Sequence, residues 1–264
     1  MLYFPQLATG ATAQFPMEWM LIHRTIFNRT PDGTLVKLDD PNASGIRWTL
    51  RYQGLTEAER AAVETLFRDT EGRLHTFVFL DPRGNLLMWS EDLSKTVWRK
   101  DGGVQIAPDV PNPEGAERAS RITNTAQIDQ GIEQTVDVPG WFHYCFSFQA
   151  RAASKTRMIL SISNSDGSIA RDLYATDNWA LYWCSGQLNG SAEELTCRVA
   201  LEAGSAIDAF GFQLAAQPNP SAYNRTYSRS GVYRRSRFMN DELRFVAHGI
   251  DNHAVTVTVF SPAT

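Results

Sequence analysis

The sequence predicts a mainly β protein in which a β-sandwich domain with one α-helix is split by an inserted jelly-roll β-sandwich. Three observations lead to this fold class. Residues 46–82 form a complete strand–helix–strand pattern, and residues 83–216 contain many short strand patterns separated by Gly, Pro, Asn and Ser. Residues 242–260 form a hairpin pattern, which cannot be stable without a sheet elsewhere in the chain.

The first residues predict an extended arm and a hairpin. Residues 1–16 contain Pro and Gly at intervals that keep the chain extended, so we expect this arm to lie across a partner or a neighbouring sheet. Residues 17–27 alternate as one strand, a turn follows at 28–33, and 34–38 form a second short strand. The Asp-Asp-Pro sequence at 39–41 predicts a turn.

The central strand–helix–strand unit has its own start and stop signals. Thr56 and Glu59 form a capping box, and Gly72 can take the left-handed conformation that ends a helix. Phe77 and Phe79 then belong to a buried strand. The alternating strand contains Ile46, Trp48, Leu50 and Tyr52, and the helical stripe contains Leu55, Ala58, Ala62, Val63, Leu66 and Phe67. The charged residues of the helix predict a solvated face with at most one useful ion pair and no catalytic group.

A second domain is predicted after Pro82, because helical patterns give way to a series of short strands. The predicted strands are 104–107, 118–123, 132–138, 142–151, 157–163, 169–175, 180–185, 195–201 and 209–214. Their number and spacing favour a sandwich or jelly roll. In the strand 143–151, Tyr144, Phe146 and Phe148 alternate with His143, Cys145, Ser147 and Gln149.

The closing hairpin determines the predicted domain boundaries. Its strands, 242–248 and 253–260, flank a turn at 249–252, and we expect them to join the sheet of Trp48 and Phe77. The first domain is therefore predicted as discontinuous, at 1–84 plus 227–264. The inserted jelly-roll domain is predicted at 85–226.

Composition excludes several functional classes. The net charge of -4 and the pI of about 5.8 argue against a nucleic-acid or membrane-surface protein, although arginines are frequent between residues 225 and 237. We interpret those arginines as an interface or linker cluster. Cys145, Cys184 and Cys197 predict buried free thiols of a protein made in a reducing cytoplasm. Neither a signal peptide nor a membrane-spanning run is predicted.

The central unit resembles a known viral domain. Its segments W-T-L-R-Y at 48–52, G-L-T-E-A-E at 54–59 and G-R-L-H-T-F-V-F-L-D-P at 72–82 resemble the domain shared by phage minor tail and distal tail proteins. The segment S-R-F-M-N-D-E-L at 236–243 and the closing hairpin resemble the continuation of that domain. The resemblance implies a ring-forming structural protein of the tail tip or baseplate. Its implied partners are further copies of itself, the tail tube and other baseplate proteins, and its implied location is the virion.

The inserted segment is similar to carbohydrate-binding-module-like jelly rolls of phage tail and fibre proteins. The similar segments are N-L-L at 85–87, S-E-D-L-S at 90–94, V-W at 97–98, I-E-Q-T-V at 132–136, F-S-F-Q-A-R at 146–151 and F-G-F-Q-L at 210–214. Such modules often carry a Glu after Gln-Leu, where this chain has Ala215, so a ligand for a structural calcium is missing. Glu91, Asp92 and Asp208 remain weak calcium candidates, and no cofactor is predicted.

Two sets of site residues follow from the chemistry that these expected roles require. A glycan site needs flat aromatic rings beside amide, carboxylate or guanidinium groups. The glycan candidates are Tyr174, Tyr182 and Trp179 with Arg171 and Asp172, although aromatic residues at strand spacing are more often core. The interface candidates are Arg234, Arg235 and Arg237, which we expect to meet Asp39 and Asp40 of the next subunit.

Two other functions are less consistent with the sequence. An envelope polysaccharide-degrading glycoside hydrolase needs two carboxylates. Asp172 with Asp177, or Glu193 with Glu194, would be the candidates, but adjacent glutamates on a strand point to opposite faces and no catalytic motif accompanies either pair. We therefore predict a protein that is not an enzyme. A free-standing lectin would not explain the split domain.

Overall fold

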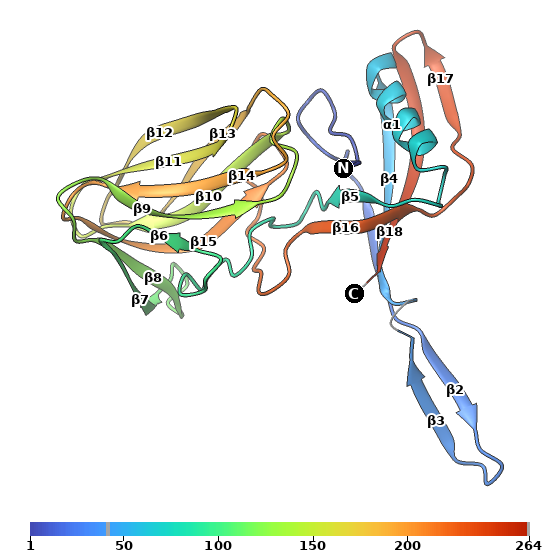
Figure 1. The fold of residues 1–264 in the computed structure, drawn as a ribbon, viewed down its shortest axis with the longest axis horizontal. Coiled ribbons are helices and arrows are strands. Elements are labelled where there is room, and N and C mark those ends of the chain that lie inside the picture. The colour runs from blue at the N-terminus through green and yellow to red at the C-terminus, as the bar shows by residue number, and fades with distance from the viewer. Residues whose placement is uncertain (41–42, 263–264) are drawn as a thin grey trace. The chain divides into compact units, whose positions relative to one another are not determined.

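The computed structural model describes residues 1–40 and 43–262 (Figure 1). Over these residues the structure is mainly β with one α-helix, as predicted. Contacts divide the chain into two compact units. The split unit comprises Met1–Ala8, Thr12–Phe79 and Tyr233–Thr264, and the jelly-roll unit comprises Thr9–Ala11 and Leu80–Val232.

The split unit contains a six-stranded sheet with the order β1-β4-β18-β16-β5, and β17 pairs with β18 at one end. The strands are β1 (Glu18–Ile22), β4 (Gly45–Leu55), β5 (Phe77–Leu80), β16 (Val232–Phe238), β17 (Phe245–Gly249) and β18 (Asn252–Pro262). In β18, Val259 lies opposite Trp48 of β4. The closing hairpin therefore joins the sheet of Trp48, and this part of the prediction is confirmed.

One face of this sheet carries the core. Trp48, Phe77 and Phe79 are almost fully buried, as the alternation predicts. The rings of Trp48 and Phe79 lie 4.8 Å apart between centroids. Val63 and Leu66 of helix α1 (Glu57–Asp69) pack into the same core.

Helix α1 begins at the predicted residues, but fewer of its side chains are buried than the sequence predicts. Thr56 and Glu59 form the capping box, and the Gly72 amide donates to the Phe67 carbonyl with φ at +65°. Ala58 and Ala62 are exposed, so the buried stripe is narrower than predicted.

The prediction of at most one helical ion pair is also wrong. Arg60 pairs with both Glu57 and Glu64, and Arg68 pairs with Glu64 as well. One central arginine can bridge carboxylates three residues before it and four residues after it, because both lie on the same side of the helix.

The predicted hairpin near the N-terminus is present, but its first strand is divided. Residues 17–27 form β1 and a separate strand β2 (Thr25–Arg29), which pairs with β3 (Leu35–Asp39) in a sheet of its own. This two-stranded hairpin extends away from the six-stranded sheet (Figure 1). Pro41 of the predicted turn lies outside the described residues.

The two outer strands of the six-stranded sheet differ in exposure. The N-terminal arm lies along β5, with hydrogen bonds of 2.9 Å from Phe4 N to Val78 O and from Val78 N to Leu2 O. The sequence predicts that the arm lies across a partner or a neighbouring sheet, and the sheet that it contacts is the six-stranded sheet of its own unit. At the other edge, β1 exposes Trp19, Met20 and Leu21 to about half of their surface or more.

The jelly-roll unit is a sandwich of two five-stranded sheets, with the orders β13-β10-β15-β8-β7 and β12-β11-β14-β9-β6. Its strands are β6 (Arg99–Lys100), β7 (Val104–Pro111), β8 (Glu117–Asn124), β9 (Gln130–Val136), β10 (His143–Arg151), β11 (Thr156–Asn164), β12 (Gly167–Ala175), β13 (Ala180–Gln187), β14 (Leu195–Leu201) and β15 (Ala206–Ala215). Each predicted strand of this segment is present, and β6 was not predicted.

Aromatic residues fill the space between the two sheets. Phe148 and Phe212 stack with their ring centroids 4.7 Å apart. Cys145, Cys184 and Cys197 are buried free thiols, as predicted, and burial raises the pKa of Cys145 to about 12.

The segments that enter and leave the jelly-roll unit are hydrogen-bonded to each other. Asp81 N donates to Gly231 O at 2.9 Å, and Gly231 N donates to Asn85 O at 2.7 Å. The two ends of the inserted segment therefore lie side by side, which is the geometry expected of a domain insertion. In the described part of the chain, no helix is long and apolar enough to span a membrane.

Candidate functional site

The outer face of the β13–β7 sheet brings polar and apolar side chains together from four strands. Register places Arg151 of β10 opposite Asp208 of β15, which lies opposite Arg121 of β8. One step along, Gln149 lies opposite Leu181 of β13. Side chains that are directly opposite share a face of the sheet, and this face is opposite to the one that carries Phe148 and the core.

The segment after β15 covers part of this face. Gln213 donates through Nε2 to Ser221 Oγ at 2.8 Å and accepts from Asn224 N at 2.7 Å. The Tyr223 ring packs on Phe210 with the centroids 5.4 Å apart. This cover explains why Ser147 and Cys145, which the alternation places on the outer face, are nevertheless buried.

The uncovered part of the face has a charged centre. Asp208 is buried and accepts from Arg121 Nε at 2.7 Å and from Arg151 Nε at 3.1 Å. Burial opposes ionisation of Asp208, but the hydrogen bonds from the two arginines outweigh it and lower the pKa of this carboxyl. The carboxylate therefore holds both guanidinium groups in fixed positions on the sheet surface.

Trp179 completes this surface, since its ring centroid lies 5.1 Å from Arg151 Cζ. Leu181 is 53% exposed nearby on β13. We use the name outer-face site for Gln149, Arg151, Trp179, Leu181 and Arg121, with Asp208 beneath them. The site combines one aromatic ring and an apolar side chain with guanidinium and amide groups, which is the chemistry that binds a sugar through its apolar face and its hydroxyl rim.

The five glycan candidates from the sequence do not form one site. Tyr174 and Asp172 lie on the outer face of the other sheet, where Arg157 Nε donates to Asp172 at 2.8 Å. Tyr182 shares the core face with Phe148 and donates to the Tyr174 carbonyl at 3.0 Å. Arg171 stacks over Trp183 at 4.8 Å. Of the five, only Trp179 belongs to the outer-face site.

Sequence reasoning missed Arg151, Arg121 and Asp208 as a group. The alternation in β10 already placed Gln149 on the face opposite to Phe148, and Arg151 continues that series. The missing information was the register, because Arg121 and Asp208 are far from Arg151 in sequence and only strand pairing joins them.

The interface candidates lie in the split unit. Arg237 is exposed and stacks over Phe260 at 5.5 Å, and Arg234 and Arg235 are exposed on the same strand, β16. Asp39 ends β3, whereas Asp40 forms an ion pair of 3.4 Å with Arg24. Their pairing between subunits stays a prediction.

The calcium candidates are separate from one another and already have cationic partners. Glu91 binds Arg118 and also Arg225, the latter at 3.0 Å, and Asp92 binds Lys95 at 3.3 Å. Asp208 binds Arg121 and Arg151. Among the described residues, no group of three or more acidic, His or Cys side chains could hold a metal ion. The three carboxylates therefore do not come together as one ligand set in the described residues, and calcium binding by any of them stays a prediction.

The four carboxylates that a glycoside hydrolase could use lie in surroundings that the sequence does not predict. Asp172 is bound by Arg157, and Asp177 accepts from the neighbouring Asn178. Glu193 and Glu194 precede β14 and are not in a strand, so the expectation that they point to opposite faces of a sheet does not apply.

No family model matches this chain, and no curated protein does. Among solved structures, it is similar to a family 61 carbohydrate-binding module in complex with β-1,4-galactotriose, at 16% identity and a TM-score of 0.40 over 49% of this chain and 97% of the other.

Two further solved structures each match 52% of this chain. A family 22 xylan-binding domain from Paenibacillus barcinonensis is 13% identical, with a TM-score of 0.43 over 96% of its length. The enzymatically active domain of tailspike protein 4 from bacteriophage CBA120 is 14% identical, with a TM-score of 0.39 over 22% of its length.

Proposed function

We propose that this protein is a structural component of a bacteriophage tail tip or baseplate, of the distal tail or minor tail type. It assembles with further copies of itself, and its jelly-roll unit binds a glycan of the host surface without cleaving it. The tail-tip role is supported by the resemblance of residues 48–82 and 236–243 to phage tail proteins. The outer-face site carries the glycan-binding part of the proposal.

The outer-face site suits a neutral sugar chain better than a small apolar ligand. The Trp179 ring can stack on the apolar face of a pyranose, while Arg151, Arg121 and Gln149 offer hydrogen-bond donors to its hydroxyls. Because Asp208 fixes both guanidinium groups before binding, less side-chain entropy is lost when the sugar binds.

Isothermal titration calorimetry is the test. The intact protein is titrated with host envelope polysaccharide and with defined oligosaccharides, and the heat of binding gives the affinity. Trp179→Ala should weaken binding roughly tenfold, about 1.4 kcal/mol. Tyr174→Ala is the matched control, because Tyr174 is 49% exposed on the outer face of the other sheet. Equal losses in the two variants, or a loss only in Tyr174→Ala, would argue against the outer-face site.

Self-assembly is supported by the β2–β3 hairpin of the split unit. Ile26, Leu38, Phe27 and Leu35 are each at least 37% exposed, and Ile26 lies opposite Leu38 on one face of the hairpin. A two-stranded hairpin with apolar residues exposed on both faces is at best marginally stable in water. Contact with another copy would cover these side chains and would also bring a partner near the exposed edge strand β1.

The assembly part is tested by sedimentation velocity over a range of protein concentrations. Wild type should form oligomers, and Ile26→Asp with Leu38→Asp should yield monomers, since charge is then buried at the contact. Ile128→Asp is the control, because Ile128 is 66% exposed in the jelly-roll unit. Electron microscopy of labelled phage particles tests the location at the tail tip.

The rival functions predict different results in the same experiments. A wild-type protein that remains monomeric and still binds glycan would be a free-standing lectin. Release of oligosaccharides that stops in Asp172→Asn would instead indicate a glycoside hydrolase.

A further inference from the structure

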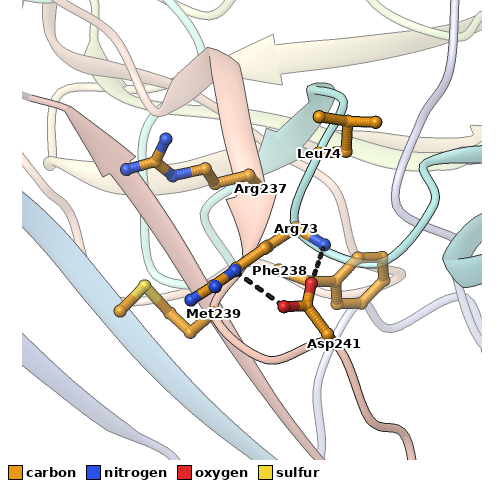
Figure 2. A pocket seen from close by; sticks show the side chains of 6 residues that line it. All are labelled: Arg73, Leu74, Arg237, Phe238, Met239 and Asp241. Atoms are coloured by element: carbon orange, nitrogen blue, oxygen red, sulfur yellow. Dashed lines mark hydrogen bonds and ion pairs between the residues drawn. The ribbon is translucent and has the colours of Figure 1, made fainter.

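Three pockets lie along the face of the six-stranded sheet that α1 does not cover. Their volumes are about 550, 910 and 190 Å³. Figure 2 shows the first, in which Arg73 pairs with Asp241 and the Arg237 side chain lies nearby. The split unit therefore has an uneven, open sheet face, in addition to the outer-face site of the jelly-roll unit.

Arginines flank a strip of threonines on this open face. Arg47 of β4 and Arg237 of β16 lie on either side of Phe260 in one row across three strands. The next row pairs Thr49 with Thr258. Small polar residues in the centre thus leave room between longer cationic side chains at the sides.

The next row of the open face is again cationic. Arg51 lies opposite Thr256, and Arg51 and Arg244 both line the pocket of about 910 Å³. Arginine side chains therefore line both ends of the threonine strip.

The pockets of the open face have a positive balance of charge. They are lined by Arg47, Arg51, Arg73, Arg237 and Arg244 against Glu18, Asp241 and Glu242, which gives 5 − 3 = +2. Arg51 pairs with Glu18 at 2.8 Å and Arg73 pairs with Asp241 at 2.8 Å. Within the described residues, Arg47, Arg237 and Arg244 have no carboxylate partner.

The helix on the other face of the same sheet has the opposite balance. Helix α1 carries Glu57, Glu59, Glu64 and Asp69 against Arg60 and Arg68, which gives 2 − 4 = -2. Hydrogen bonds from Arg60 lower the pKa of Glu57 and of Glu64, so both carboxylates are ionised at neutral pH. Asp69 has no basic partner in the part of the chain that is described. The open sheet face and α1 are thus a cationic and an anionic pole on opposite sides of the sheet.

We infer that the open sheet face of one copy binds the α1 face of the next copy, so that subunits associate head to tail. The occupant is a second copy, because one unit carries both the cationic and the anionic surface. These two surfaces lie on opposite sides of one sheet, so they cannot meet within one molecule. A contact between two different faces continues from copy to copy and can close into a ring. This inference rests on the proposed self-assembly and adds the open sheet face and α1 to the β2–β3 hairpin as contact surfaces.

A charge-exchange experiment on the full chain tests the assignment. The first variant carries Arg47→Glu with Arg237→Glu, and the second carries Glu64→Lys with Asp69→Lys. Each variant alone should associate at least about tenfold more weakly than wild type, because like charges then meet at the contact. An equimolar mixture of the two should associate again, since each reversed face finds its complement on the other variant. Glu114→Lys with Glu117→Lys, exposed in the jelly-roll unit, is the control and should associate as wild type does.

Salt dependence gives a second measurement, because ions screen exposed charges. Wild-type association should weaken as sodium chloride is raised from 0.05 to roughly 0.5 M, where the Debye length is about 4 Å. Circular dichroism checks that each variant is folded, and Arg51→Glu with Arg244→Glu replaces the first variant if that one is not.

The outcomes separate this inference from the proposed function. If wild type assembles and either variant alone assembles equally well, or the mixture does not recover, the head-to-tail contact is wrong while assembly stands. If wild type remains monomeric at every concentration and at low salt, both the contact and the self-assembly proposal are wrong.

Discussion

The carboxyl group of Asp208 has a defined role at the scale of single residues. It is 4% exposed and lies between Arg121 and Arg151, whose hydrogen bonds lower its pKa from the usual 3.8. Since the pKa is lower in the folded state than in the unfolded state, ionised Asp208 stabilises the fold above the unfolded pKa. This contribution decreases as pH falls through the lowered pKa of the folded protein.

We therefore expect Asp208→Asn to reduce the free energy of unfolding by about 1.5–3 kcal/mol at pH 7, the range for hydrogen bonds to charged groups. The difference from wild type should shrink as the pH falls below 3.8, because the wild-type carboxyl then becomes protonated. Urea unfolding at pH 7 and pH 3 measures both values. A difference that is equal at the two pH values would show that the charge of Asp208 does not stabilise the fold. Asp177→Asn is the matched control, since Asp177 is exposed.

At the scale of elements, helix α1 depends on its first turn. Thr56 Oγ1 accepts from Glu59 N at 3.2 Å, and Glu59 Oε2 accepts from Thr56 N at 2.9 Å. Glu59 also accepts from Ala8 N at 2.8 Å, so the same side chain ties the N-terminal arm to the helix.

Thr56→Ala should destabilise the split unit by about 1 kcal/mol, the typical cost of losing an N-cap. Thr56→Ser keeps the accepting hydroxyl and should restore most of that stability. Chemical denaturation of the two variants measures the effect. If Thr56→Ser destabilises the unit as much as Thr56→Ala does, the lost stability comes from packing of the threonine methyl group and not from capping.

Elements with strong local signals could be predicted from the sequence, and pairings between distant strands could not. Period-two alternation and turn residues located the strands of the jelly roll, and the capping box located the start of α1. The sequence predicts too wide a helical stripe, because Ala58 and Ala62 have the spacing of buried positions but are exposed. The grouping of Arg121, Arg151 and Asp208 depends on register, which local sequence does not contain.

At the scale of the whole molecule, the two segments that enter and leave the jelly-roll unit lie in close contact at two glycines. Gly84 and Gly231 come so close that a Cβ added to Gly84 would lie 2.9 Å from Gly231 Cα. Both positions therefore need glycine, and the two crossing segments run side by side, held by the hydrogen bonds of Gly231 to Asp81 and Asn85. A short linker can replace everything between them without stretching the chain.

We therefore expect the split unit to fold without residues 85–230, when Gly84 is joined to Gly231 through a short Gly/Ser linker. Its core cluster consists of residues from 4–79 and 238–259, so the deletion removes none of its buried side chains. The shortened chain should keep a cooperative thermal transition and a circular dichroism spectrum of mixed strand and helix. It should also self-associate as the full chain does, because the hairpin, the open sheet face and α1 all remain. An unfolded product would mean that the jelly roll is required for folding of the split unit. A folded product that stays monomeric while the full chain assembles would place the assembly contact on the jelly roll.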